Sequence, residues 1–193
     1  EREILKLTNE IHIDFVFENA KRYAQPRELR GDAWRGWALW NPILLHEKGK
    51  FFEYTQAILR SQFDDPANLM KRAYSFSAPA RTAWTEMTLA PDEAEPLKYL
   101  AALADAANAF AVLTGAPLTE RRLLADFPAR AQKLGNAELL KLLLEALGGQ
   151  MSVEFIRAAL PKWEAAFVAA AQNPRDLRIH PARLAYYKSA IET

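Results

Sequence analysis

Residues 11–18, Ile-His-Ile-Asp-Phe-Val-Phe-Glu, alternate between the two faces of a β-strand. Isoleucine and phenylalanine fill one face, whereas Asp14 falls on the other face between two apolar neighbours. A first strand is predicted over residues 3–8, and the Thr-Asn-Glu stretch between the strands is typical of a turn. Because two strands cannot form a stable sheet alone, this pair must pack against helices, another copy or further chain.

Beyond Asp64-Asp65-Pro66, apolar residues recur at the spacing of amphipathic helices. The sequence therefore predicts an α+β chain that is predominantly α, in which a small N-terminal strand remnant precedes an all-α helical bundle. The predicted domains are residues 1–62 and residues 63–193. The predicted helices cover about 66–77 with a continuation beyond Pro79 to 87, and about 92–114, 119–133, 137–147, 153–172 and 181–191.

The region between the strands and this boundary is less regular. Residues 19–31 carry many charges and Pro26, so they predict a loop. Residues 34–42 are too short and too interrupted to assign. A short strand at 43–45 is predicted to leave through a glycine turn into a helix over about 51–62.

The helical domain is expected to have one cooperative core. Large apolar residues recur every three or four positions in the two longest predicted helices, 92–114 and 153–172. The expected core includes Leu97, Leu100, Leu103, Phe110, Leu140, Leu143, Phe155, Leu160 and Phe167.

Composition excludes several classes of protein. The 25 basic and 24 acidic residues give a net charge of +1, so no nucleic-acid partner is expected. The chain has no cysteine, which excludes a disulfide framework, and its three scattered histidines do not predict a zinc or iron site. No apolar run is long enough to cross a bilayer and no secretory segment is visible, so we expect a cytoplasmic protein without a membrane partner.

Asp14 is the main candidate for chemistry. Carboxylates that project from strands hold Mg²⁺ in two-metal phosphoryl-transfer sites, because this hard cation needs several oxygen ligands on a rigid surface. The ordinary alternative is that Asp14 belongs to the solvated face of an edge strand, and the pattern alone favours this alternative.

Two further groups have both a functional and an ordinary interpretation. Arg121 and Arg122 follow a turn at the start of a predicted helix, where their guanidinium groups would hold a phosphate. The ordinary alternative is that they form solvated surface, and the pattern favours this alternative. Trp34, Trp37 and Trp40 recur every third residue. Their rings would stack on a nucleotide or sugar. The ordinary alternative, favoured because large aromatic side chains dominate packing between domains, is that they seal the strand layer against the helical domain.

The strand at 11–18, the expected glycine-containing hairpin at Ile43–Phe52 and two helical segments, Tyr99–Ala109 and Leu113–Arg122, together show a family resemblance. The chain resembles the carboxyl-terminal part of nucleotidyltransferases of the polymerase-β superfamily, close to the kanamycin-type antibiotic nucleotidyltransferases. That superfamily combines a Gly-Ser step and an Asp-x-Asp pair with a third Asp on a later strand. Only the third has a match here, at Asp14.

The resemblance implies transfer of a nucleoside monophosphate from a Mg²⁺-bound nucleoside triphosphate to a small hydroxyl acceptor. Asp14 would be the third carboxylate, as metal ligand or base, and the helical domain would form the acceptor side of the cleft. Because the Asp-x-Asp pair does not occur in the sequence, we expect the chain as given to be inactive. The alternative is a non-catalytic helical module that binds a partner helix or mediates dimerisation, and a homodimer is possible under either hypothesis.

Overall fold

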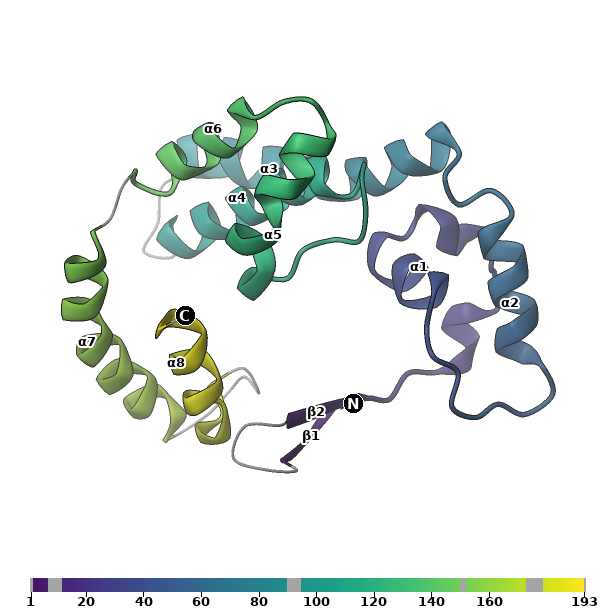
Figure 1. The fold of residues 1–193 in the computed structure, drawn as a ribbon, viewed down its shortest axis with the longest axis horizontal. Helices are drawn as coiled ribbons and strands as arrows, with labels where there is room; N and C mark the ends of the chain where they lie inside the picture. Colours follow the sequence, from purple (N-terminus) through teal and green to yellow (C-terminus); the bar gives the residue numbers. More distant parts are fainter. Residues whose placement is uncertain (1, 7–11, 90–94, 150–151, 173–178, 193) are drawn as a thin grey trace.

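The computed structural model describes residues 2–6, 12–89, 95–149, 152–172 and 179–192. In these residues a β-hairpin is followed by helices, so the predicted fold class, predominantly α with a small strand remnant, is confirmed. The helices follow one another along an open arc (Figure 1). The elements are β1 Arg2–Lys6, β2 His12–Val16, η1 Ala20–Tyr23, η2 Glu28–Gly31, α1 Ala33–Trp40, α2 Phe51–Arg60, α3 Pro66–Leu89, α4 Glu95–Ala111, α5 Glu120–Lys133, α6 Glu138–Ala146, α7 Val153–Ala171, η4 Pro181–Arg183 and α8 Leu184–Glu192.

The two predicted strands form an antiparallel pair. The register sets Ile4 opposite Asp14. The strands are slightly shorter than predicted, and residues 7–11 lie outside the described residues. Ile13 and Phe15, on the apolar face of β2, are 38% and 42% exposed. The face that the sequence assigns to packing is therefore largely uncovered.

The predicted loop at 19–31 is wrong in part, because it contains two short 3₁₀ helices. Asn19 begins the first, and its side chain accepts a hydrogen bond from the Lys21 amide. Asp32, which follows the second, accepts a hydrogen bond of 2.8 Å from the Arg35 amide and so begins α1, in the segment that the sequence left unassigned. Short polar side chains thus begin local helices that apolar spacing does not predict.

The strand predicted at 43–45 is also wrong, and with it the hairpin at Ile43–Phe52. Residues 42–47 have no regular secondary structure. The Glu47 carboxylate accepts hydrogen bonds from the amides of Phe52 and Glu53, at 2.9 and 3.2 Å. This stretch therefore leads into the first turn of α2, whose free amides take a side-chain acceptor, instead of pairing with a strand.

A small core holds η2, α1 and α2 together. Phe63 is fully buried, stacks on Trp40 at 4.7 Å between ring centroids, and meets Trp37 edge to face at 5.2 Å. These two tryptophans are core side chains among helices, so they do not seal the strand layer. The buried members of this core are Leu29, Leu39, Leu59 and Phe63.

Helix α3 is continuous through Pro79, where the sequence predicts an interruption. Proline removes one helical hydrogen bond, that to the carbonyl of Ser75. Both residues lie on the exposed side of α3, where water can satisfy that carbonyl. The helix therefore runs on to Leu89 and packs along α4.

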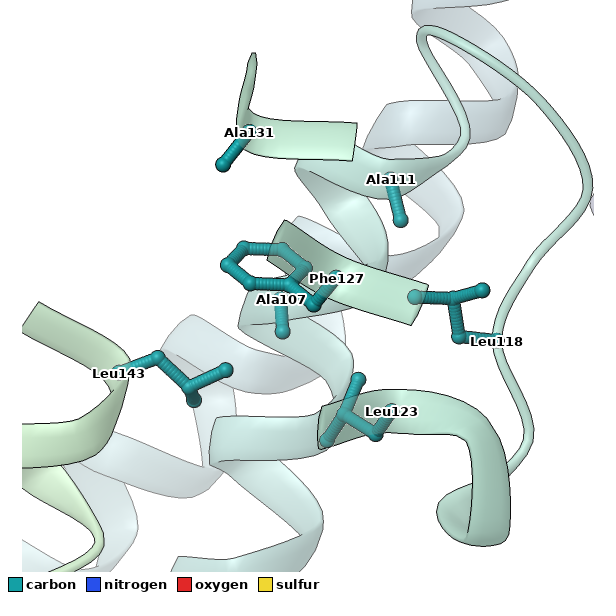
Figure 2. Packing of buried hydrophobic residues seen from close by; sticks show 7 residues of the cluster. All are labelled: Ala107, Ala111, Leu118, Leu123, Phe127, Ala131 and Leu143. Atoms are coloured by element: carbon teal, nitrogen blue, oxygen red, sulfur yellow. The ribbon is translucent and has the colours of Figure 1, made fainter. Parts of the chain in front are cut away.

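The main core lies between α4, α5 and α6 (Figure 2). Phe127 of α5 is almost completely buried, and α4 presents alanines to it, so the helices approach closely. A third cluster joins α1 and α3 to the end of α4 through Ala33, Ala73, Phe76 and Val112. The buried residues of the main core are Ala107, Ala111, Leu118, Leu123, Phe127, Ala131 and Leu143.

The predicted core is right for some residues and wrong for others. Leu143 is buried, and Leu103, Leu140, Leu160 and Phe167 are half-buried. The remaining four are exposed, because α4 uses alanines for its contacts and α7 is covered over only part of its length. These exposed residues are Leu97, Leu100, Phe110 and Phe155.

The loop between α4 and α5 is fixed by two side chains. Asn108 is buried; its amide nitrogen donates to the Leu118 carbonyl at 3.0 Å, and its carbonyl accepts from the Leu118 amide at 2.6 Å. Arg130 donates to the carbonyls of Thr114 and Ala116 at 2.9 and 3.4 Å. Gly115 leaves room for this guanidinium, since a Cβ there would lie 1.3 Å from its Nη1.

Replacing Asn108 with alanine should lower the free energy of unfolding by about 1–3 kcal/mol, because it leaves both polar groups of Leu118 buried without partners. Urea denaturation followed by circular dichroism measures this change. Asn136→Ala is the matched control, since this side chain is exposed, and its effect should stay within about 0.5 kcal/mol. Equal effects of the two substitutions would contradict the role of Asn108.

Candidate protein interface

Asp14 lies in the middle of β2, opposite Ile4. Within the described ranges no group of three or more His, Cys, Asp or Glu residues could hold a metal ion. The role of Asp14 as a ligand or base therefore stays a prediction.

Arg121 and Arg122 lie in the first turn of α5, as predicted. The guanidinium of Arg122 is exposed and lies 3.9 Å from the Asp126 carboxylate, one turn further along the same helix. Figure 1 shows β2 and α5 in separate parts of the arc, so the structure does not bring Asp14 and these arginines together. Their phosphate-binding role also stays a prediction.

The feature that the sequence analysis missed is the amount of uncovered apolar surface. The total exposed surface of the chain, polar and apolar together, is 13,953 Å². A compact monomer of 21.8 kDa exposes about 9,300 Å², so this chain exposes about one and a half times that area. Large apolar side chains that are half or more exposed occur on most of the helices, which identifies the chain as a candidate for association through apolar surface.

One uncovered face lies on α4. Residues at alternating spacings of three and four form a continuous apolar face, here called the α4 stripe. Its second half is buried under α5. Its first half is not: Leu97 is 73% and Leu100 is 51% exposed. The α4 stripe consists of Leu97, Leu100, Ala104, Ala107 and Ala111.

Helix α7 has the same arrangement. Its second half packs on α8, where the rings of Phe167 and Tyr187 lie 5.9 Å apart and Lys188 pairs with Glu164 at 2.9 Å. Its first half is partly uncovered: Val153 is 56% and Ile156 is 37% exposed. The α7 stripe consists of Val153, Ile156, Leu160, Trp163 and Phe167. On α4, the spacing that led to the wrong core prediction for Leu97 and Leu100 is thus the signal of an uncovered face, whereas Phe155 of α7 is exposed outside the α7 stripe.

A third apolar feature lies beside α1 and α2. Ile43 and Leu44 line a shallow hollow of about 160 Å³, and the neighbouring Leu45 is 92% exposed. The volume suits one aliphatic side chain and is too small for a nucleotide. The other lining residues are Leu39, Pro42, Phe52, Glu53 and Gln56.

The segment after the hairpin is held by a polar contact. The Tyr23 hydroxyl donates a hydrogen bond to Glu18, whose carboxylate also lies 3.1 Å from Arg22. Burial, and then the bond to Glu18, raise the pKa of Tyr23 to about 12. The same bond is the largest cause of a lowered pKa for Glu18.

Tyr23 should therefore ionise about two pH units later than a free tyrosine. A raised folded-state pKa means that its stabilising contribution is complete below the unfolded value and is lost as the pH rises through about 12. Titration of tyrosinate absorbance should show a late step that disappears in Tyr23→Phe and in urea-unfolded protein. A late step that persists in Tyr23→Phe would show that another residue causes it.

No helix among the described residues is long and apolar enough to cross a membrane. Comparison of the chain with family models, with curated proteins and with solved structures gives no match.

Proposed function

We propose that this chain is an assembly module, a helical scaffold that acts by binding another polypeptide through the uncovered halves of the α4 and α7 stripes. The observation that supports the proposal most directly is the exposure of large apolar side chains on these helices, with Leu97 73%, Leu100 51% and Val153 56% exposed. Large apolar patches rimmed by polar residues mark interaction sites on proteins, because their burial releases water. A location in the cytoplasm is part of the same proposal and is supported by composition alone.

The pattern of exposure favours helix recognition over binding of a small molecule. Each stripe has the three-four spacing with which amphipathic helices pack on one another. Neither stripe has a buried polar group beside its uncovered half that would orient a small ligand, within the part of the chain that the structure describes. A partner helix that lies along the stripe would cover Leu97 and Leu100 together.

Small-angle X-ray scattering tests the proposal through particle mass and radius of gyration. A compact domain of 193 residues has a radius of gyration of about 16 Å. We expect either a particle heavier than one chain or a single chain that is clearly more extended. A compact particle with the mass of one chain would contradict the proposal.

Charged substitution locates the interface. Leu97→Glu combined with Leu100→Glu should decrease self-association or partner binding, because a buried carboxylate without a partner is costly. Tyr74→Glu is the control, since Tyr74 of α3 is 66% exposed and lies outside both stripes. Equal effects of the control and the double variant would contradict an interface at the α4 stripe.

Nucleotidyl transfer is a second candidate. It is supported by the resemblance and by the place of Asp14 at the centre of a two-stranded hairpin, a sheet that needs further strands. In a completed sheet Asp14 would add the third carboxylate that holds Mg²⁺ next to a nucleoside triphosphate.

Paramagnetic broadening by Mn²⁺, used in place of Mg²⁺, tests this second candidate in the chain itself. Broadening of the amide signals of residues 13–15 should appear at millimolar metal and disappear in Asp14→Asn, which keeps the size of the side chain and removes its charge. Asp126→Asn should leave this broadening unchanged. If Asp14→Asn also leaves it unchanged, Asp14 is not a ligand.

A further inference from the structure

We infer that the peptide bond between Leu45 and His46 is a processing site, at which an endopeptidase with an apolar specificity pocket cuts the folded chain into two parts that stay together. The inference is independent of the proposed function, because the site lies outside both stripes. A peptidase of this class takes one large apolar side chain into its pocket and pairs with the neighbouring backbone. The bond that it cuts therefore needs an accessible side chain and unused backbone groups.

The connection between α1 and α2 has both properties. Residues 42–46 have no regular secondary structure, and their backbone groups form no hydrogen bond within the described residues. Ile43 is 87% and Leu45 is 92% exposed. Figure 1 shows the connection as a loop at one edge of the molecule, next to α2. Leu45 thus presents a free side chain on a backbone whose donors and acceptors are available to an enzyme.

Both ends of the connection are fixed to α2. Before it, Gln56 donates to the Leu39 carbonyl at 2.9 Å, and Arg60 donates to the Trp40 carbonyl at 2.7 Å. After it, the Glu47 carboxylate accepts from two amides of the first turn of α2. The segment between these contacts is accessible while α1 and α2 remain folded, so cleavage does not require unfolding.

Other large side chains meet only one of the two conditions. Leu142 is 53% and Tyr74 is 66% exposed, but both lie in helices, where the backbone amides and carbonyls are paired. Leu118 lies in an irregular loop, but it is 4% exposed and its amide and carbonyl bind Asn108. Leu45 combines the exposure of the first two with an irregular backbone that nothing holds.

The cleavage follows the chemistry of a serine peptidase. The hydroxyl of the enzyme attacks the carbonyl carbon of Leu45, the bond to the His46 nitrogen breaks, and this nitrogen takes up a proton. Water then hydrolyses the acyl-enzyme. One water molecule is consumed, and the products carry a carboxylate at Leu45 and an amine at His46.

The two parts share one core, so the cut chain should remain one particle. The core around Phe63 takes side chains from both sides of the cut: Leu29 and Leu39 precede it, whereas Leu59 and Phe63 follow it. A buried hydrogen bond also crosses the cut, from Arg72 of α3 to a carbonyl of η2. Cleavage therefore creates a free apolar carboxyl end at residues 43–45 and leaves the helices assembled.

Limited digestion with chymotrypsin, whose pocket accepts aromatic and leucine side chains, tests the inference on the whole chain. Intact mass should show a first cut after Leu45, which gives residues 1–45 and 46–193. The two fragments should elute together in gel filtration and separate only in urea. A first cut after any other residue, resistance of the folded chain, or fragments that separate without urea would overturn the inference.

Three variants show whether the native segment itself is the substrate. Leu45→Pro should lower the initial cleavage rate by about ten-fold or more, because it removes the side chain that fills the pocket and blocks the bond after Leu44 as well. Far-UV circular dichroism verifies that this variant is folded. Leu142→Asn is the matched control, since it removes an exposed leucine from a helix and should leave the rate unchanged.

The third variant, Asn108→Ala, separates cleavage of the native chain from cleavage through unfolding. It destabilises the fold at a distance from the segment, so the rate of the cut after Leu45 should equal that of the unmodified chain. A rate that rises with the loss of stability would show that the enzyme cuts a transiently opened form. That result would also overturn the inference.

Discussion

The buried guanidinium of Arg72 connects the first helices to the rest of the chain. It is fully buried in α3, donates hydrogen bonds to the carbonyls of Arg30 and Phe63, and lies 4.0 Å above the Phe63 ring. Burial lowers its pKa below the ordinary value of an arginine. Arg30 in turn donates to the Ile58 carbonyl, so two arginines fix η2 and the end of α2 to α3. A buried charge keeps this geometry because moving away would leave it without partners.

Helix positions could be predicted where their causes are local. Ser152 begins α7 by accepting from the Phe155 amide at 3.2 Å, and Gly135 ends α5 with a φ of 67°. Both signals are visible in the sequence. The buried faces could not be predicted, because alternating apolar residues show that a helix has an apolar face but not how much of it another helix covers. Leu97 and Phe127 each belong to a series of apolar residues at helical spacing, yet only Phe127 has a helix packed over it.

The hairpin and the helices both expose apolar side chains that no other part of the described structure covers. Phe15 of β2 and Leu100 of α4 are each about half exposed although their spacing is that of packed residues. The two candidate functions explain this differently: an assembly module requires a partner over the helices, whereas nucleotidyl transfer requires further strands beside Asp14. Both functions therefore require that apolar surface uncovered in this structure becomes covered by further polypeptide.

The loop between α4 and α5 determines how long the uncovered part of the α4 stripe is. Asn108 and Arg130 fasten this loop at three carbonyls and one amide, so α5 begins at a fixed distance along α4 and covers only its second half. The length of this loop thus sets the position along α4 at which α5 begins. A change in the length of this loop would move the start of α5 along α4 and so change how much of the α4 stripe is uncovered.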